Sequence, residues 1–451
     1  MNATFQSYAK ASAHQGGRMK IAVIGSGISG ASAAWALNPH HDVILYEREA
    51  TPGGHTATAD IDYNGRAIAV DTGFIVYNEA TYPNLTALFR HLDVKTHASD
   101  MSFALSLDHG RLEWSGDTLD TLFAQRRNIF RPSFLLMIRE ILRFNRLCLR
   151  DRAKGHLRQL SIGDYLNWRG FSPGFTNNYL VPMAAAIWSS PAARLLDFPA
   201  EQFVNFFDNH RLIYSEPHQW RTVSGGSRNY LEKLLEPLGH RLRLNCGIRE
   251  VRRVGAQVAV RDASGSETLF DKVIFASHSD QILDMLSDAR PDERRLLAAI
   301  PYQPNRVVLH RDEALMPVRR KVWASWNYLR CSKGETSSAA TVTYWMNRLQ
   351  GIADECPLFV TLNPDREPDP AKVFAEYTYE HPLFDASGMA AQRELQAIQG
   401  RDNCYFAGAW TAYGFHEDGL RSGLEAAAAL GAQVPWWPHR ETAPTPVAEA
   451  A

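Results

Sequence analysis

The sequence predicts an α/β fold in which one discontinuous nucleotide-binding domain is interleaved with a second domain of α+β type. A strand, a glycine-rich turn, a helix and a second strand follow one another between Lys20 and Glu47. A further strand, a loop and an alanine-rich helix follow between Cys404 and Leu430. The chain has 451 residues, and at roughly 100–200 residues per domain it is long enough for two or three folding units.

The composition is that of a folded protein without a global charge bias. Lys+Arg number 48 and Asp+Glu 49, so the net charge of −1 gives no general attraction for nucleic acid. Apolar residues make up 45% and charged residues 22% of the chain, which excludes intrinsic disorder. No apolar run reaches the roughly 20 residues of a membrane span, and residues 1–19 lack the pattern of a signal peptide.

The cysteines indicate a reducing compartment. The chain has 5, widely scattered and without a C-x-x-C pair. This distribution argues against a disulfide scaffold and against a zinc site. We therefore expect a cytoplasmic protein without a bound metal.

The amino-terminal elements predict a βαβ unit. Residues 20–24 are expected to form a short buried strand, and the glycine turn at residues 25–30 opens a helix that includes Ala34 and Leu37. Residues 43–47 supply the second strand. Such a unit is nearly always parallel and right-handed.

The middle of the chain alternates between helical and β-rich stretches. Asn64-Gly65 predicts a hairpin turn, and residues 81–92 have helical periodicity. Residues 119–211 are mostly helical in pattern, residues 241–276 contain short strands, and residues 292–394 are mixed and rich in Trp and Tyr. A strand at 404–407 and a helix at 419–430 complete the series.

These patterns predict the domain boundaries. The nucleotide-binding domain is expected to comprise residues 19–105, 216–290 and 395–434, and the second domain residues 106–215 and 291–394. Residues 1–18 and 435–451 are expected to be a flexible extension and a flexible tail.

The glycine turn and the residues after the second strand predict a dinucleotide site. Gly25, Gly27 and Gly30 suit a tight turn, close approach to a pyrophosphate and close packing of helix on strand. Glu47 lies 20 residues beyond Gly27, where a carboxylate accepts hydrogen bonds from a ribose and disfavours the 2′-phosphate of NADP. A second glycine pair, Gly53-Gly54, favours FAD. The residues expected at this site are Gly25, Ser26, Gly27, Ile28, Ser29, Gly30, Glu47, Arg48, Gly53, Gly54, His55 and Thr56; the alternative is a glycine turn without a ligand.

With these motifs the sequence resembles the flavin-containing amine oxidase superfamily, which includes protoporphyrinogen oxidases and carotenoid desaturases. The resemblance extends to Phe406-Ala407-Gly408, to Gly419-Leu420 with Ser422-Gly423, and to residues 220–230. It implies an FAD-binding domain of the glutathione-reductase type. It also implies cofactor contacts at Gly408, Ala409, Trp410, Gly419, Leu420 and Ser422, and a backbone contact of Val251 with the adenine.

The sequence departs from the family pattern at three places. His55 stands where the family usually has Arg, and Ala409 stands where it usually has Asp or Glu. No cysteine lies between Trp410 and Gly423. The resemblance therefore implies FAD that is bound non-covalently.

The expected chemistry is the removal of a hydride from the substrate, since the cofactor carries the reactivity. The sequence has no G-x-S-x-G or H-E-x-x-H motif and shows no evident acid–base pair. Aromatic residues gather at 323–345 and at 410–415, where they either line a substrate cavity or pack in the core. The catalytic candidates are Trp326, Tyr413 and His416; residues 416–418 form either a loop beside the flavin, with His416 as a proton carrier, or a capped helix start.

Residues 126–158 predict a basic helix. They contain ten basic residues and two acidic ones, Glu140 and Asp151. Arg139, Arg143, Arg146 and Arg150 share one helical stripe, and Phe134, Ile138, Ile141, Leu142 and Leu149 lie on an adjoining face. This helix either lies on an anionic membrane surface or is half-buried with a solvated arginine edge.

The leading hypothesis is an FAD-dependent oxidase or desaturase that acts on an apolar substrate. The sequence resembles most a bacterial branch of the superfamily that includes a desaturase of methyl-branched fatty-acyl phospholipids in furan fatty acid formation. This resemblance implies an acyl-chain substrate and peripheral contact with the inner face of the membrane. The alternatives are an amine oxidase for a soluble amine and, outside enzymes, a lipid-binding escort protein similar to the GDP-dissociation inhibitors; the sequence assigns neither a catalytic base nor an oligomeric state.

Overall fold

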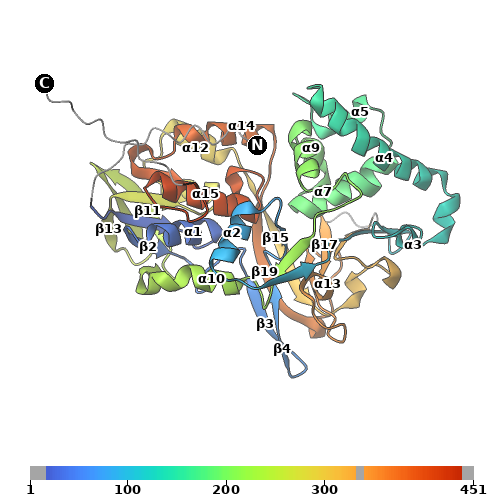
Figure 1. The fold of residues 1–451 in the computed structure, drawn as a ribbon, viewed down its shortest axis with the longest axis horizontal. Helices are drawn as coiled ribbons and strands as arrows, with labels where there is room; N and C mark the ends of the chain where they lie inside the picture. Colours follow the sequence, from blue (N-terminus) through green and yellow to red (C-terminus); the bar gives the residue numbers. More distant parts are fainter. Residues whose placement is uncertain (1–16, 332–339, 439–451) are drawn as a thin grey trace.

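The computed structural model describes residues 17–331 and 340–438, which form two parts that lie side by side (Figure 1). One part is built on a parallel sheet with helices on both faces, and the other on a larger mixed sheet with a helical cap. The predicted α/β fold is confirmed. The expected flexible ends fall mostly on residues 1–16 and 439–451, outside the described residues.

A five-stranded parallel sheet forms the core of the first part. Its strand order is β10-β2-β1-β14-β20, so strands from both ends and from the middle of the chain are neighbours. The central strand is fully buried at Ile21, Ala22 and Val23, as its apolar sequence predicts. The strands are β1 (Lys20–Ile24), β2 (Asp42–Tyr46), β10 (Leu242–Arg243), β14 (Lys272–Phe275) and β20 (Cys404–Phe406).

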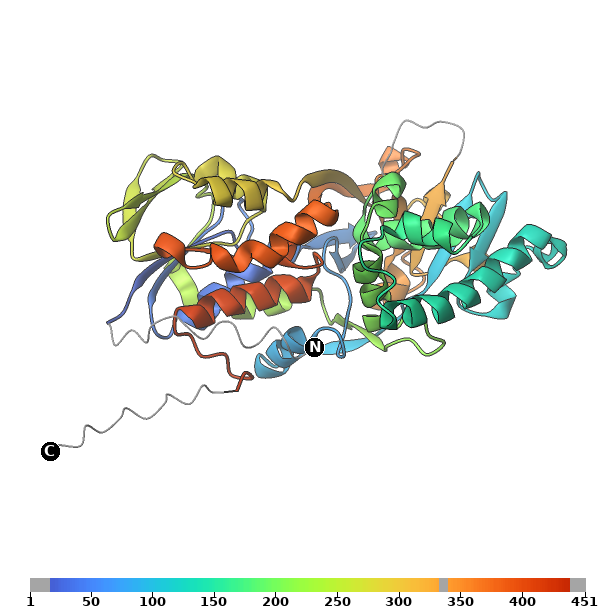
Figure 2. The same ribbon diagram turned by 90° about the horizontal axis from the view of Figure 1, so that it is seen from above.

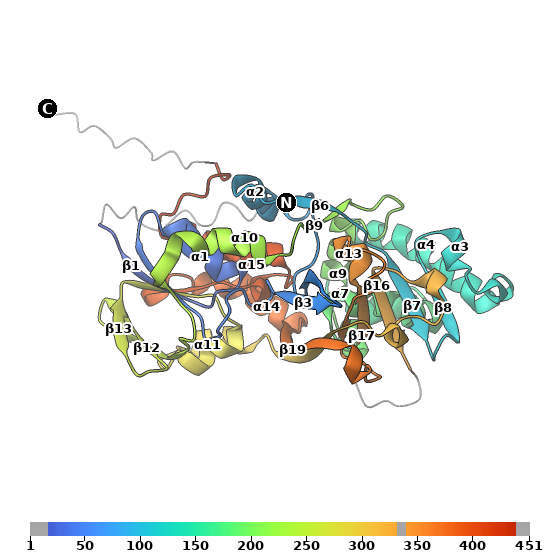
Figure 3. The same cartoon turned by 90° about the horizontal axis from the view of Figure 1, so that it is seen from below.

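Helix α1 (Ile28–Leu37) follows β1 and packs against both α10 (Arg228–Leu235) and α15 (His416–Ala429) (Figure 3). Its buried residues are mostly Ser, Gly and Ala, and these short side chains let other helices approach its backbone closely. Helix α15 begins three residues earlier than the predicted start at Gly419. Helices α11 (Ser279–Met285), α12 (Pro291–Ala298) and α14 (Ala386–Glu394) complete this part. Helix α12 packs on both α11 and α14, so residues 291–298 and 386–394, predicted for the second domain, lie with the first part.

Three smaller sheets extend the first part. β11 (Ile248–Val254), β12 (Gln257–Asp262) and β13 (Glu267–Phe270) are antiparallel. β3 (Thr58–Tyr63) and β4 (Arg66–Asp71) form a hairpin, which confirms the turn predicted at Asn64-Gly65. β5 (Tyr77–Asn78), β9 (Trp220–Val223) and β6 (Thr96–Ser99) form the third, and α2 (Pro83–His91) lies within the helix predicted at residues 81–92.

A seven-stranded sheet forms the base of the second part, in the order β19-β15-β18-β17-β16-β7-β8. The long strands β15 and β19 run along the boundary between the two parts (Figure 1). The predicted domain boundary at residue 105 falls inside β7. The strands are β7 (Phe103–Leu107), β8 (Leu112–Ser115), β15 (Tyr302–His310), β16 (Trp326–Arg330), β17 (Thr341–Trp345), β18 (Phe359–Leu362) and β19 (Val373–Pro382), with α13 (Met346–Gln350) after β17.

A helical cap covers the second part (Figure 2). The mostly helical pattern predicted over residues 119–211 is confirmed. In the described residues no helix combines the length and the hydropathy needed to cross a membrane. The main helices of the cap are α3 (Leu119–Leu122), α4 (Pro132–Ala153), α5 (Ile162–Trp168), α7 (Val181–Trp188), α8 (Ala192–Leu196) and α9 (Ala200–Asn209), with the 3-10 helix η1 (Arg126–Phe130) before α4.

The chain is still packed at Trp436 and Trp437, beyond the predicted start of the flexible tail at Pro435. The Trp436 ring stacks on Trp35 with the ring centroids 6.1 Å apart. Trp436 and Trp437 both donate hydrogen bonds through Nε1 to the side-chain oxygen of Asn84, at 3.1 and 2.8 Å. The prediction was wrong for residues 435–438 because two indole rings bury enough apolar surface to hold this segment.

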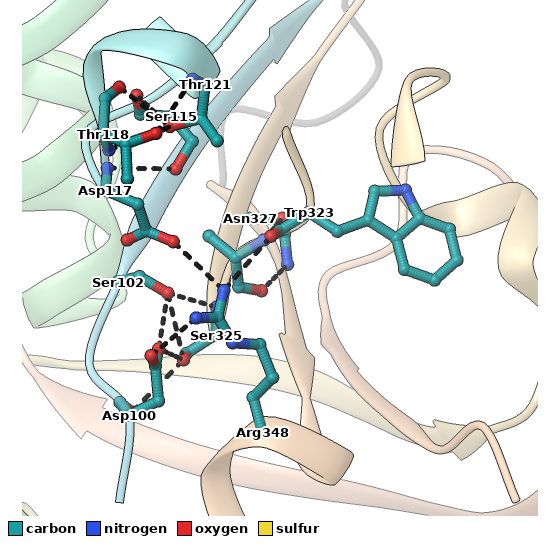
Figure 4. A network of polar contacts seen from close by, with 11 residues as sticks. Asp100, Ser102, Ser115, Asp117, Thr118, Thr121, Trp323, Ser325, Asn327 and Arg348 are labelled. Carbon is teal, nitrogen blue, oxygen red and sulfur yellow. Dashed lines mark hydrogen bonds and ion pairs between the residues drawn. The ribbon is translucent and has the colours of Figure 1, made fainter. Parts of the chain in front are cut away.

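A network of polar side chains fixes the connection between the two parts (Figure 4). Asp100 lies between β6 of the first part and β7 of the second, and its carboxylate accepts hydrogen bonds from Ser102 at 2.6 Å and from Ser325. Arg348 donates to Asp100 at 2.7 Å and to Asp117 at 3.1 Å. One guanidinium therefore joins α13 to the start of β7 and to the loop before α3.

We expect Arg348→Met to lower the free energy of unfolding by about 1.5–3 kcal/mol, because it leaves two carboxylates without their charged donor. Urea unfolding followed by circular dichroism measures this change. Arg295→Met is the matched control, since the Arg295–Glu394 pair is more exposed and should change stability by less than about 1 kcal/mol. Equal losses in the two variants would contradict the role of the network.

Candidate functional site

The glycine turn between β1 and α1 has no room for a side chain at Gly25 or at Gly30. Gly25 has φ +101°, and a Cβ atom there would lie 2.7 Å from the Ala276 carbonyl oxygen. A Cβ on Gly30 would lie 1.8 Å from the Gly25 oxygen. The turn therefore presses α1 onto the sheet and presents the amino end of this helix, which attracts anions such as a pyrophosphate.

Glu47, directly after β2, is bound to this turn. Its Oε2 accepts hydrogen bonds from the Ser26 amide at 3.0 Å and the Ser26 hydroxyl at 2.5 Å. The Glu49 amide donates to its Oε1 at 3.0 Å. These donors hold the carboxylate at the carboxyl end of the sheet, where a ribose of a dinucleotide binds in this type of fold.

The second glycine pair faces the first turn. The Gly53 amide donates to the Ser26 hydroxyl at 3.0 Å, and a Cβ on Gly54 would lie 3.5 Å from the Gly27 Cα. Both Gly53 and Gly54 have positive φ, +120° and +56°. The structure thus brings the two glycine motifs of the sequence together, and Thr56 next to them bonds the Tyr230 hydroxyl at 2.7 Å.

The carboxyl-terminal motif lies against the same turn. The Ser422 hydroxyl accepts a hydrogen bond from the Gly408 amide at 2.9 Å, which fixes the loop after β20 to α15. A Cβ on Gly423 would lie 2.1 Å from the Ser29 carbonyl oxygen, and one on Gly419 would lie 2.9 Å from Ile28 Cγ2. Residues 408–423 and residues 25–30, distant in the sequence, are therefore neighbours.

Two buried polar atoms beside these motifs have no hydrogen-bond partner among the described residues. One is His55 Nε2 and the other is the Ser277 hydroxyl, which follows β14 beside Gly25. The indole of Trp410 donates to the Ser277 carbonyl at 3.1 Å, so the carboxyl-terminal loop borders this place as well. Unpaired buried polar atoms and side-chain-free turns are the features that a bound dinucleotide would satisfy.

Arg48 and Val251 are placed differently from the other predicted residues. Arg48 points to the surface and forms an exposed ion pair with Glu49 at 2.9 Å. Val251 is fully buried in β11, and its carbonyl accepts a hydrogen bond from the Ser287 amide at 3.1 Å. The predicted backbone contact of Val251 with an adenine therefore does not fit its position.

Sequence reasoning missed the segment that lies beside the backbone of Glu47 and Arg48. The Cys246 amide donates to the Glu47 carbonyl at 2.7 Å, and a Cβ on Gly247 would lie 3.2 Å from the Arg48 Cβ. Gly247, directly before β11, is the residue from which this contact could have been predicted. A glycine next to a strand often marks a place where another backbone comes close.

Aromatic side chains of the helical cap pack against the loop before α15. Phe206 of α9 stacks on Phe415 at 4.9 Å between ring centroids, and its ring centroid lies 6.1 Å from that of Tyr413. His210 stacks on Phe206 at 4.0 Å. Burial lowers the pKa of His210 to about 4, so this ring is neutral near pH 7. The sequence predicted Tyr413 and Phe415 beside the cofactor. It did not predict that residues of α9 pack against them, because these contacts join segments that are distant in the sequence.

His416 lies in the first turn of α15 rather than in a loop. Its ring stacks on Phe74 at 3.9 Å, and its Nε2 is hydrogen-bonded to the Tyr230 hydroxyl. Burial lowers the pKa of His416 to about 3. The ring is therefore uncharged at neutral pH, which argues against the proton-carrying role considered for it.

The two acidic residues that follow His416 are held by backbone donors. Glu417 accepts hydrogen bonds from the Asn84 and Leu85 amides, both at 3.0 Å, at the start of α2. Asp418 accepts from the Tyr413 amide at 3.2 Å and the Phe415 amide at 3.1 Å. Asp418 thus shapes the aromatic loop, as the alternative of a capped helix start proposed.

Trp326, the third catalytic candidate, lies in β16 of the seven-stranded sheet. It packs edge-on against Tyr344 of β17 at 5.1 Å between ring centroids. Its indole nitrogen is buried, and the described residues offer it no hydrogen-bond partner. Trp326 therefore belongs to the wall of the second part and not to the loop that carries Tyr413 and His416.

Comparisons with known proteins agree with this geometry. Residues 28–314, more than half of the chain, match the family model described as flavin containing amine oxidoreductase. No curated protein sequence matches the chain.

Several solved structures share the fold at low sequence identity. The CLA-producing fatty acid isomerase from P. acnes has a TM-score of 0.65 at 17% identity, over 91% of this chain and 98% of that one. The cyclohexylamine oxidase from Brevibacterium oxydans IH-35A has a TM-score of 0.64 at 15% identity, over 92% and 98%. A putrescine oxidase bound to putrescine has a TM-score of 0.64 at 15% identity, over 92% and 99%.

We expect Glu47→Gln to raise the Kd for FAD by roughly 10- to 150-fold, because loss of a charged acceptor costs about 1.5–3 kcal/mol. Titration of the apoprotein with FAD, followed by quenching of flavin fluorescence, measures the change. Glu49→Gln is the control, since only its backbone contacts Glu47. Equal FAD affinity in the Glu47→Gln and Glu49→Gln variants would remove Glu47 from the site.

We also expect FAD to leave the protein on acid precipitation, because the loop from Trp410 to Gly423 has no cysteine to form a thioether. The absorbance of the supernatant and of the pellet measures this release. A yellow pellet that keeps its flavin after washing in denaturant would show a covalent bond instead.

Proposed function

Because the chain belongs to the flavin-containing amine oxidoreductase family and is an FAD-dependent oxidoreductase, we propose that its substrate is apolar. In its most specific form, the proposal is that the enzyme desaturates a methyl-branched fatty-acyl chain of a phospholipid. In that reaction a hydride leaves one carbon and a proton leaves its neighbour, so that a double bond forms. FAD, when bound, supplies the two-electron acceptor for the hydride.

The residues of the candidate site fit this cofactor. The amino end of α1 and the turn at residues 25–30 would bind the pyrophosphate, and Glu47 would accept hydrogen bonds from the ribose. Gly53 and Gly54 leave space for backbone contact, and the loop at residues 408–410 would border the ring system. His55 Nε2 and the Ser277 hydroxyl are the buried polar atoms that such a ligand would pair.

The observation that carries the proposal is the neutral, aromatic wall beside this loop. Phe206 is buried and stacked against both His210 and Phe415, Tyr413 lies beside it, and the low pKa of His210 keeps that ring uncharged at neutral pH. The nearby carboxylates of Glu417 and Asp418 are occupied by backbone amides. This wall favours an apolar chain, whose transfer out of water is favourable, over an ammonium group, which would need a carboxylate partner.

A small pocket lies close to the loop. Phe384, one of its lining residues, is the nearest contact of Gly414, at 3.0 Å from a Cβ placed on this glycine. The lining is mostly apolar, with Arg194 and Asp385 as its charged residues. It is formed by Trp188, Ser190, Arg194, Leu195, Phe198, Pro301, Leu383, Phe384 and Asp385.

The comparisons leave two substrate classes to be separated. One protein of this fold is named a fatty acid isomerase and two are named amine oxidases. Tyr413 and Phe415 provide the observation in favour of an amine, since their rings could hold a cation by a cation–π contact worth roughly 0.5–2 kcal/mol. Glu201 of α9 is a second observation on the side of an amine, since burial and the charges of Asp418 and Glu201 raise the pKa of Tyr413. The acyl-chain proposal rests on the aromatic residues around Tyr413 and on the pairing of Glu417 and Asp418 with backbone amides.

We expect phospholipid vesicles with methyl-branched acyl chains to bleach the flavin absorbance when mixed with the holoenzyme without oxygen. Putrescine and cyclohexylamine should leave it unchanged. Vesicles with straight saturated chains are the matched lipid control, and photoreduction checks that the flavin can be reduced. Bleaching by the amines and not by any lipid would replace the proposal with an amine oxidase.

A further inference from the structure

Exposed apolar side chains gather at one end of the helical cap. Large apolar side chains on a protein surface are normally scattered, and a cluster of them indicates a contact site. Eleven of them are exposed among the described residues, and six lie between residues 119 and 142. Leu119 is 76% and Phe130 86% exposed. We name these six residues the apolar tip: Leu119, Ile129, Phe130, Leu135, Leu136 and Leu142.

The apolar tip and the outer face of α4 form one surface. The Phe123 ring, which follows α3, packs on Phe134 of α4 at 5.8 Å and so holds α3 against the start of this helix. Along α4, exposed positions recur at helical spacing from Leu135 through Leu142 to Arg150. In all three views α3 and the start of α4 lie at the end of the molecule opposite to β13 (Figures 1, 2 and 3).

The two acidic residues of α4 are turned away from the surface, and Asp120 of α3, which is exposed, is paired with Arg126 and Lys321. Glu140 is 5% exposed and accepts hydrogen bonds from Ser172, and Asp151 is fully buried and pairs with Arg169. All exposed charges of α4 are therefore positive. The sequence of this helix has an excess of basic residues. Because the fold buries both of its carboxylates, the exposed face of α4 carries only positive charge.

Three of the four predicted arginines are available on this surface. Arg139, Arg146 and Arg150 are exposed, and no ion pair in the described parts of the chain involves them. Arg143 is the exception and corrects the prediction of a four-arginine stripe. It donates to the carbonyls of Arg169 and Gly170 after α5 and lies over the Phe171 ring at 4.6 Å.

We propose that the apolar tip and the outer face of α4, with Arg139, Arg146 and Arg150, bind the surface of an anionic lipid bilayer. Side chains such as Phe130 and Leu119 enter the boundary between headgroups and acyl chains, and the arginines bind lipid phosphates. A second copy of this chain is a poorer occupant, because a twofold contact would set the unpaired arginines of both copies against one another. This inference goes beyond the proposed function, since the binding does not depend on which substrate is oxidised.

The test is co-sedimentation of the FAD-loaded protein with sucrose-filled vesicles. Wild type should pellet with vesicles of equal parts phosphatidylcholine and phosphatidylglycerol, and far less with phosphatidylcholine alone. Phe130→Ser combined with Leu119→Ser should abolish most of the binding. Val254→Ser combined with Leu269→Ser removes two exposed apolar side chains from the β11–β13 sheet, and this control should bind like wild type.

Charge-reversal variants test the contribution of the arginines on the outer face of α4. Each arginine near an anionic bilayer changes binding by roughly fivefold, so Arg139→Glu with Arg146→Glu should weaken the partition coefficient by more than about tenfold. Arg366→Glu with Arg393→Glu makes the same change of net charge at exposed positions elsewhere and should bind almost like wild type. The flavin spectrum of each variant confirms that it is folded.

Two results would overturn the proposal. One is equal sedimentation of wild type with anionic and neutral vesicles, or equal sedimentation of the tip variants and their controls. The other is a dimer of wild type in analytical ultracentrifugation that Phe130→Ser with Leu119→Ser converts to a monomer, with no lipid binding by either. Failure of vesicles to bleach the flavin would not affect this proposal, because sedimentation reports binding alone.

Discussion

The close approach of α15 to the amino end of α1 is the constraint on which the rest of the structure depends. The two helices meet where Gly423 faces the Ser29 carbonyl, a contact that no larger residue could make without a shift of the backbone. This contact sets the carboxyl-terminal loop beside the glycine turn of the first βαβ unit. The cofactor site therefore needs segments from both ends of the chain, and the residues between them can form the second part of the molecule.

The electrostatics of the site follow from its burial. Polar groups near the glycine turn are held in place by hydrogen bonds, as Glu47 is by Ser26. The fold therefore orients these groups for an anionic ligand that also forms hydrogen bonds. On the substrate side, burial lowers the pKa of His210 and of His416, and both rings are neutral at physiological pH. One side of the candidate site thus suits a polar dinucleotide, and the proposal of an apolar substrate rests on the neutral rings of the other side.

Local patterns allowed the sequence to predict the fold class and the two nucleotide-binding motifs, because a βαβ unit and its glycine turn are encoded within about 30 residues. Contacts between distant segments could not be predicted in this way. The wall residue Phe206 comes from α9, and Cys246 and Gly247 reach Glu47 through strand pairing across the sheet. The helical pattern of α4 was visible in the sequence, but the inward direction of Glu140 and Asp151 depends on packing against α5 and the segment after it.

The contact between the two ends of the chain is tested most directly by equilibrium binding of FAD to two alanine variants. Gly423→Ala places a methyl group 2.1 Å from the Ser29 oxygen, whereas Gly116→Ala meets no atom within 4 Å. We expect wild type and Gly116→Ala to bind one FAD per chain, and Gly423→Ala to lose most of its affinity for FAD. Unchanged FAD affinity in Gly423→Ala would contradict the claim that this contact forms the site.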